Sequence, residues 1–324
     1  MPSITDIEGI KVGHASDRRA LTGCTVILCE KETIAGVEVR GSAPGTRQID
    51  SLGPLHTVSE IHAVLLTGGS SYGLDAAGGV MHYLEEMGKG FDVGVARIPI
   101  VPTAVIFDLG LGDPKRRPDR LMGYRACLNA SRQVTEGSVG VGTGATVGKL
   151  FELRRAMKGG LGTWSVRGPE GVIVGALVVV NAFGDVIDHR TGRQIAGLRD
   201  ERGNGLVSTA ELLRHGVRKE RFGLFSQNTT LGVVATNARL DKIGVIKLAQ
   251  MAAGALAKVI SPFGTTFDGD IVFSLATGEV SMDVNNLAAM AEEAMAEAVR
   301  RAVILADGFG IIPAHKDLFG PIAL

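Results

Sequence analysis

The 324-residue chain has little of several features that define common protein classes. Its three cysteines, Cys24, Cys29 and Cys127, are odd in number and form no CxxC pair. Neither a disulfide framework nor a thiolate zinc site is therefore indicated, and we expect the cysteines to be small buried apolar residues. The seven histidines include no HExxH motif and no pair at metal-ligand spacing, so a metal hydrolase is not indicated.

An excess of charge of one sign and a long apolar run are also missing. Lys plus Arg and Asp plus Glu both number 34, so no overall basic field exists to attract nucleic acid or a membrane surface, and neither is an expected partner. The stretch GVIVGALVVV, residues 171–180, is about half as long as a membrane span requires. The N-terminal sequence has no signal-peptide pattern, so we expect a cytoplasmic protein.

Glycine, in contrast, is abundant, with 45 residues. Many glycines lie in pairs beside apolar runs, which indicates tight turns and close backbone approaches. Hydrophobic residues make up 45% of the chain, enough for a large core, and no linker, charge block or repeat divides it. We predict a single domain over residues 1–324.

Hydrophobic patterning predicts long helices and strands that are buried on both faces, and hence layered sheets covered by helices. The strand candidates are residues 25–29, 63–66, 104–107, 172–180, 185–188, 231–236 and 271–275. The helix candidates are residues 74–87, 123–134, 242–259 and 286–306, with Asp241 or Asn285 as N-caps and Gly308 as a C-terminal stop. The segment VVVNAFGDVID, residues 178–188, is typical of a hairpin.

A first candidate for chemistry is the segment LLTGGSSYGLDAAGG, residues 65–79, which contains the pattern G-x-S-x-G between a strand candidate and a helix candidate. That context suits a nucleophile elbow with Ser71 as nucleophile. Asp108 or Asp188, with His189 or His215, could complete a triad, although nothing local supports them. The simpler interpretation is a glycine-rich turn that starts a helix close to a sheet.

Two other segments place charged residues beside glycines. GSVGVGTGATVGKL, residues 137–150, matches neither a P-loop nor a G-x-G-x-x-G fingerprint, and leaves Lys149 either delivered into the protein or solvated at its surface. In FDGDIVFSLATG, residues 267–278, Asp268 and Asp270 either share one side of a strand as a negative site or simply form a turn.

The segment FSQNTTLGVVATNA, residues 225–238, places a polar cluster before an apolar, β-branched run. It could be only the entry to a buried strand, because threonine is a good strand former. It could also be a self-cleavage site between Asn228 and Thr229. A threonine with a free amino group carries its own base, since the pKa of an α-amine, about 7.7–8.0, is close to the working pH.

Together these stretches resemble one family, the self-processing N-terminal nucleophile hydrolases of the S58-type D-aminopeptidase/esterase group. That group includes β-peptidyl aminopeptidases and the endo-type 6-aminohexanoate-oligomer (nylon-oligomer) hydrolases. The matching stretches, in chain order, are TDIEGIKVGH, LLTGGSSYGLDAAGGV, PTAVIFDLG, GSVGVGTGATVGK, KGGLGT, VVVNAFG, NTTLGVVATNA and FDGDIVF. They cover nearly the whole chain, and NTT with DGD downstream is most similar to the nylon-oligomer branch.

The resemblance implies an α/β fold, a four-layer αββα sandwich, and a homo-oligomer, a tetramer of α/β heterodimers. It implies autocatalytic cleavage into an α chain of residues 1–228 and a β chain of residues 229–324. The implied activity is hydrolysis of linear oligoamides, such as 6-aminohexanoate oligomers, or of peptides. An aminopeptidase that releases N-terminal D-, L- or β-amino acids is the alternative. No cofactor or metal is expected, because the implied mechanism uses side chains and the α-amine.

Carried over by position, the resemblance makes Thr229 the nucleophile, places Lys149 beside its amine, makes Asn181 the oxyanion donor, and lets Asp268 and Asp270 position the Thr229 end. These roles are physically reasonable. A cation near the new α-ammonium lowers the pKa of that amine. An amide donor to the oxyanion is worth about 3 kcal/mol.

One departure concerns Phe107, which stands where the nylon-oligomer hydrolases have a tyrosine and which cannot donate a hydrogen bond. The donor is dispensable, or Tyr72 replaces it, or the substrate differs. Other functions stay open: an acyltransferase with the same self-cleaving chemistry, and a non-catalytic relative that never processes.

Overall fold

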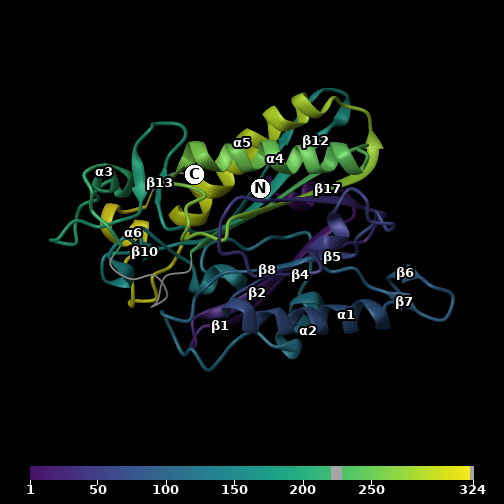
Figure 1. Cartoon of the computed structure of the whole chain (residues 1–324), viewed down its shortest axis with the longest axis horizontal. Helices are drawn as coiled ribbons and strands as arrows, with labels where there is room; N and C mark the ends of the chain where they lie inside the picture. Colours follow the sequence, from purple (N-terminus) through teal and green to yellow (C-terminus); the bar gives the residue numbers. More distant parts are fainter. Residues whose placement is uncertain (220–227, 322–324) are drawn as a thin grey trace.

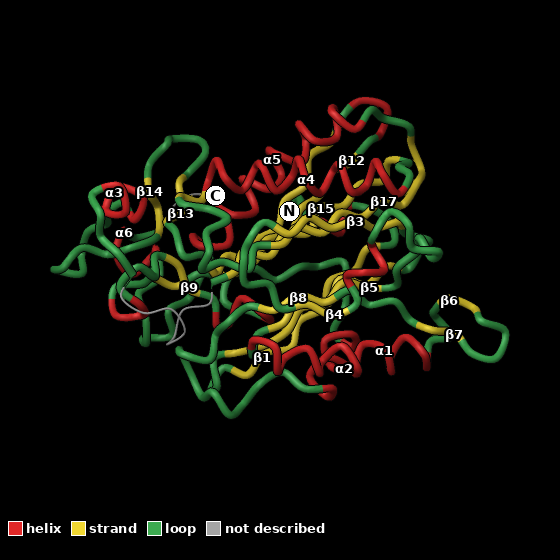
Figure 2. The backbone as a smooth tube through the Cα atoms, viewed as in Figure 1, coloured by secondary structure: helices red, strands yellow, loops and turns green. Residues whose placement is uncertain are grey.

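Two five-stranded sheets lie face to face in the computed structural model, and helices cover the outer face of each (Figure 1; Figure 2). The structure describes residues 1–219 and 228–321. The first sheet has the order β1 (Ile10–Asp17), β2 (Thr22–Cys29), β5 (Ala63–Thr67), β8 (Thr103–Val105), β4 (Thr46–Arg47). The second has the order β11 (Gly160–Arg167), β12 (Ile173–Asn181), β15 (Thr229–Ala238), β17 (Ile271–Val280), β3 (Ile34–Val39).

The first sheet is covered by α1 (Ala76–Glu86) and α2 (Arg120–Leu128), and the second by α4 (Lys242–Val259) and α5 (Val284–Ile304) (Figure 1). The shorter helices are α3 (Thr209–Arg214) and α6 (His315–Phe319), and the 3₁₀ turns are Ile4–Asp6, Ile49–Leu52, Ser70–Asp75, Gly140–Gly144, Glu152–Arg154 and Pro169–Gly171. The remaining strands are β6 (Phe91–Asp92), β7 (Arg97–Ile98), β9 (Thr146–Val147), β10 (Met157–Lys158), β13 (Asp185–Ile187), β14 (Gln194–Ala196) and β16 (Ile260–Ser261).

The apolar core follows the layers. Alternate residues of β12 belong to two clusters: Val174, Ala176 and Val178 pack with α4 and α5, whereas Leu177 and Val179 pack between the two sheets. Such a strand is buried on both faces, as its continuous apolar sequence predicts. The predicted αββα arrangement is confirmed.

Glycine allows the outer helices to approach the sheets closely. A Cβ atom at Gly162 of β11 would lie 2.1 Å from the carbonyl oxygen of Ala298 in α5, and one at Gly160 would lie 2.4 Å from that of Ala302. Real Cβ atoms do not tolerate such contacts, so these positions require glycine. The predicted use of glycine for close backbone approach is confirmed here.

Helix α4 has the predicted bounds because its cap is strong: a carboxylate oxygen of Asp241 accepts a hydrogen bond from the backbone N–H of Gly244, at 2.7 Å. The other cap predicted, Asn285, is wrong. Asp283 caps α5 by accepting from the N–H of Asn285, at 2.8 Å. Helix α5 ends at Ile304, before the predicted stop at Gly308.

Helix α2 is displaced from its predicted range of residues 123–134. It begins earlier because Asp119 caps it by accepting from the N–H of Met122. It ends earlier because Ser131 pairs with Val12 at the edge of the first sheet. A strand contact from far along the chain, which local sequence does not encode, sets this boundary.

The hairpin predicted for residues 178–188 is wrong. Strand β12 ends at Asn181, and β13 pairs with β14 and β16 in a separate three-stranded sheet. The intervening residues are held by another segment, because the N–H groups of Gly148 and Lys149 donate to the carbonyl oxygens of Gly184 and Phe183, both at 3.0 Å. Asn181 therefore lies at the end of the large sheet and not in a hairpin.

Two compositional expectations can be compared with the structure. Cys24, Cys29 and Cys127 are buried and unbridged, as predicted. Within residues 1–219 and 228–321, none of the helices has the length and apolarity needed to cross a membrane.

Candidate active site

Thr229 is the first residue of β15, a central strand of the second sheet. Its antiparallel partner across β12 is Asn181, and on its other side β15 runs parallel to β17, which begins just after Asp270. Three strand ends therefore meet at one place. Thr229 and Asn181 are both buried there, with 4% and 0% of their surfaces exposed.

The peptide bond between Asn228 and Thr229 is held by a defined set of hydrogen bonds. The Thr229 hydroxyl Oγ1 donates to the carbonyl oxygen of Asn228, at 2.6 Å. The same oxygen accepts from the backbone N–H of Gly269, at 2.7 Å, and the N–H of Asn228 donates to the carbonyl oxygen of Phe267, at 3.1 Å. Asn228 thus pairs in parallel with Asp268. A hydroxyl and a backbone donor converge on one carbonyl group.

Lys149 reaches this region from the glycine-rich segment. Its Nζ donates to both the backbone oxygen and the side-chain Oδ1 of Asn181, each at 2.8 Å. Gly148 makes the turn possible, with a φ of 72° and no room for a side chain against Gly197. Lys149 is only 4% exposed, so the interpretation as a solvated surface charge is wrong.

The environment of Lys149 favours its neutral form. Burial, followed by the nearby charge of Lys219, holds the pKa of Lys149 well below its ordinary value. Lys219 donates to the carbonyl oxygen of Lys149 at 3.1 Å, and its Nζ lies 5.0 Å and 5.4 Å from the ring centres of Phe183 and Phe267. Burial lowers the pKa of Lys219 to about 8. A lysine of this kind can accept a proton near neutral pH.

Asn181 is oriented by its neighbours. Its Oδ1 accepts from Lys149 and from the backbone N–H of Thr146, at 3.0 Å, which leaves the amide Nδ2 as the donor end. Nδ2 donates to the carbonyl oxygen of Phe107, at 3.3 Å. The amide is therefore fixed with its donor group on the side away from Lys149.

The two aspartates hold the starts of the neighbouring strands. Asp270 accepts from the N–H groups of Thr230, at 2.5 Å, and Gly264, at 3.0 Å. Asp268 accepts from the N–H of Phe183, at 3.2 Å, and from the N–H and hydroxyl of Thr265. Burial and the adjacent Asp268 charge raise the pKa of Asp270 to about 8, and burial raises that of Asp268. Asp270 thus fixes the residue that follows Thr229.

The possible substrate-binding residues lie apart. Phe107 contributes its carbonyl group to Asn181, and with Thr146 and Lys149 it lines a cavity of about 10 Å³, which is room for one water at most. Tyr72 is 64% exposed, with the Arg117 guanidinium 4.0 Å above its ring. No hydrogen bond within the described part of the chain joins Tyr72 to Asn181 or Thr229.

The Ser71 elbow is not assembled as a triad. Ser71 is exposed in the turn after β5. His189 lies 3.7 Å from Glu297, and His215 is at the exposed C-terminal end of α3. Asp108 accepts from Thr22 and the N–H of Gly69, so it braces the turn itself. The simpler interpretation, a glycine-rich turn, is the better one.

Sequence reasoning missed the backbone groups of Phe267 and Gly269, together with Thr146 and Thr265, which orient the predicted side chains. One signal was available for Gly269, because a glycine between two acidic residues suits a close approach. A Cβ atom there would lie 2.5 Å from the carbonyl oxygen of Ala43 and 3.0 Å from Thr229 Oγ1.

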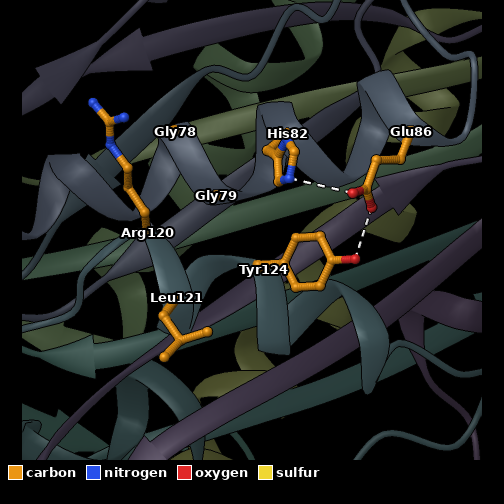
Figure 3. Close-up of a pocket in the computed structure, with 7 residues that line it drawn as sticks. All are labelled: Gly78, Gly79, His82, Glu86, Arg120, Leu121 and Tyr124. Atoms are coloured by element: carbon orange, nitrogen blue, oxygen red, sulfur yellow. Dashed lines mark hydrogen bonds and ion pairs between the residues drawn. The ribbon is translucent and has the colours of Figure 1, made fainter.

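A hollow of about 480 Å³ lies elsewhere, on the outer face of α1 and α2 (Figure 3). Its polar groups are engaged with one another: Glu86 accepts from Tyr124 at 2.7 Å and lies 3.2 Å from His82 Nε2. Its lining has no serine, threonine or cysteine. Within residues 1–219 and 228–321, no group of three or more His, Cys, Asp or Glu side chains is placed to hold a metal ion.

Comparison with known structures identifies the same fold. A β-aminopeptidase of Burkholderia sp. matches with a TM-score of 0.70 and 22% identity, over 99% of this chain and 93% of its own. The L-aminopeptidase D-Ala-esterase/amidase of Ochrobactrum anthropi, described as a new variant among the Ntn hydrolase fold, matches with a TM-score of 0.69 and 20% identity, over 94% and 86% of the two chains.

Sequence comparison gives the family. An uncharacterized aminopeptidase of Mycobacterium leprae is 40% identical over 98% of this chain and 94% of its own. The 6-aminohexanoate-oligomer endohydrolase of Kocuria sp. is 29% identical over 92% and 84%. Residues 2–313 match the model of peptidase family S58. This chain therefore belongs to peptidase family S58, and it is a hydrolase of amide bonds with an Ntn-type α/β sandwich.

Proposed function

We propose that Thr229 is the nucleophile of this hydrolase and that the chain cuts itself between Asn228 and Thr229. The products are an α chain of residues 1–228 and a β chain of residues 229–324. The observation that carries the proposal is the geometry of this peptide bond. The Thr229 hydroxyl lies 2.6 Å from the carbonyl oxygen that it would convert to an oxyanion, and the Gly269 N–H already donates to that oxygen.

Self-cleavage needs a base other than the α-amine, which does not yet exist. Lys149 suits this role, because its pKa is held well below the ordinary value and it contacts Asn181, the cross-strand partner of Thr229. The threonine oxygen bonds to the Asn228 carbonyl carbon, the carbon–nitrogen bond breaks, and the proton passes to the leaving amine. Water then hydrolyses the ester to release the Asn228 carboxylate.

In the mature enzyme the freed α-amine of Thr229 becomes the base. A substrate acyl group transfers to the hydroxyl, the amine product leaves and water hydrolyses the ester. Asn181 is proposed to donate to the oxyanion through Nδ2. Asp270, bonded to the N–H of Thr230, and its neighbour Asp268 keep the new terminus in place and receive its ammonium form.

For the substrate we propose release of N-terminal residues from peptides and similar amides. Relatives that are 40% identical are described as aminopeptidases, whereas those described as 6-aminohexanoate-oligomer endohydrolases are 28–29% identical. Endo-type cleavage of linear oligoamides is the second candidate, supported by those relatives over 92% of the chain.

The first test is intact mass of the denatured protein, with N-terminal sequencing of any fragment. We expect two fragments, the smaller beginning Thr-Thr-Leu-Gly, and one intact chain for Thr229→Ala. An intact wild-type chain that hydrolyses amides would remove Thr229 from the mechanism. Products from one peptide with a free and with a blocked N-terminus separate exo from endo cleavage, and addition of an acceptor amine detects acyl transfer.

A further inference from the structure

Asn228 is bound to the neighbouring backbone as a substrate residue would be. Its N–H donates to the Phe267 carbonyl oxygen at 3.1 Å, and its carbonyl oxygen accepts from the Gly269 N–H at 2.7 Å. The side-chain Nδ2 of Asn228 also approaches the Phe267 oxygen, at 3.3 Å. Residues 267–269 therefore present one acceptor and one donor, in the parallel pairing that an added strand uses.

We propose that the backbone of residues 267–269 is the acyl-residue subsite of the enzyme, that the Gly269 N–H is an oxyanion donor, and that Asn228 occupies this subsite in the intact chain as a tethered substrate. The inference rests on the proposed function. After cleavage, the acyl residue of an incoming amide takes the same two contacts.

Gly269 is suited to the role in charge and in shape. Its N–H points at the carbonyl oxygen beside the Thr229 hydroxyl, whereas the Asn181 amide donates to Phe107 in the intact chain. As the threonine oxygen adds to the carbonyl carbon, the carbonyl π electrons move onto that oxygen, and a fixed donor at 2.7 Å stabilises the charge. When the oxyanion collapses, the electron pair leaves with the amine, which takes the hydroxyl proton.

The spacing of the two contacts selects the substrate. One α-carbon separates the nitrogen and carbonyl carbon of Asn228, so one α-aminoacyl group meets both Phe267 and Gly269. A 6-aminohexanoyl group has several methylene groups between its nitrogen and carbonyl, so it cannot meet both in this register. A free α-ammonium satisfies the Phe267 oxygen as well as a peptide N–H does, in agreement with aminopeptidase action.

The donor is tested by placing glycolic acid, the α-hydroxy counterpart of glycine, at position 269 by suppressor-tRNA incorporation in cell-free synthesis. This change removes the N–H and adds no side-chain atom. We expect self-cleavage, followed by intact mass over time, to slow about 10²–10³-fold, and turnover of the matured protein to fall similarly. The matched control is glycolic acid at Gly310, an exposed turn residue, with unchanged cleavage.

The outcomes separate the inference from the proposed function. A wild-type chain that never cuts after Asn228 refutes the proposed function. A wild-type chain that cuts, with a folded 269 variant that cuts equally fast, refutes only the inference. Melting temperature and circular dichroism confirm that the 269 variant is folded.

The subsite is tested on wild-type enzyme with three p-nitroanilides, of alanine, propionic acid and 6-aminohexanoic acid. We expect kcat/KM to be at least about tenfold higher for the alanyl compound than for either other compound, because only it makes both contacts and its donor is charged. Equal kcat/KM for the alanyl and 6-aminohexanoyl compounds would overturn the proposed spacing rule.

Discussion

Replacement of Lys149 by methionine tests the proposed base directly. The Lys149 ammonium group makes two hydrogen bonds of 2.8 Å to Asn181 and is otherwise enclosed by protein. A positioned general base contributes about 10²–10⁴ in rate. Loss of this group should therefore slow self-cleavage by that factor, which corresponds to about 2.7–5.5 kcal/mol of activation free energy.

The variant should still fold. Methionine has a similar length and needs no desolvation of a charge, and Asn181 Oδ1 keeps its bond from Thr146 N–H at 3.0 Å. The Asn181 backbone oxygen loses its lysine donor, which costs about 1–3 kcal/mol if nothing replaces it. Removal of a buried cation offsets part of that cost.

The assay is the fraction of intact chain by mass spectrometry at successive times after rapid purification, at several pH values. In the wild-type protein the rate should rise with pH through the lowered pKa of Lys149, because only the neutral amine accepts a proton. The matched control is Lys158→Met, a second buried lysine that donates to the carbonyl oxygens of Gly142, Ala145 and Gly159. It should lower stability and retain cleavage. A folded Lys149→Met chain that cleaves at the wild-type rate would refute the assignment.

Three further outcomes are expected. Phe273→Ala, between the two sheets, should lower the free energy of unfolding by about 3–5 kcal/mol in urea, measured in the Thr229→Ala background so that one intact chain unfolds; a loss below 1 kcal/mol, roughly, would contradict the packing described. The pKa of Asp270 is raised from 3.8 to about 8, so between these values the folded chain keeps a proton that the unfolded chain releases. Stability should therefore fall as pH rises from about 4 to about 8, and Asp270→Asn in the same background should reduce that fall in urea titrations; an unchanged pH profile would speak against the raised pKa. Prolonged treatment with a chelator should leave amide hydrolysis unchanged, since the proposed steps use Thr229 and protein groups alone, and loss restored by a metal would contradict them.

The fold could be predicted where the local signals are strong. Helix α4 has the predicted bounds, because the Asp241 cap and an apolar face coincide. Strands β1, β3 and β11 were not predicted. Their sequences, such as GLGTWSVR in β11, mix glycine and polar residues and become strands through pairing with partners such as β12.

The site was predictable in its side chains and not in its backbone. Thr229, Asn181 and Lys149 could be named from motif stretches, and the structure brings them together. The contacts of Phe267 and Gly269 use main-chain groups that every residue type possesses, so no residue pattern distinguishes them. The low pKa of Lys149 depends on enclosure by Asn181, which lies 32 positions away in the chain, and hence on the tertiary fold.

The strand order of the second sheet has a consequence for assembly of the cut protein. Strand β15 pairs with β12, and β17 pairs with β3, so both strands downstream of Asn228 have partners from upstream of it. After scission the sheet becomes an interleaved product of two polypeptides, and refolding changes from a first-order to a second-order reaction. Denaturation of the cut enzyme should then show hysteresis and dependence on protein concentration, whereas the uncut precursor should refold at a rate independent of dilution.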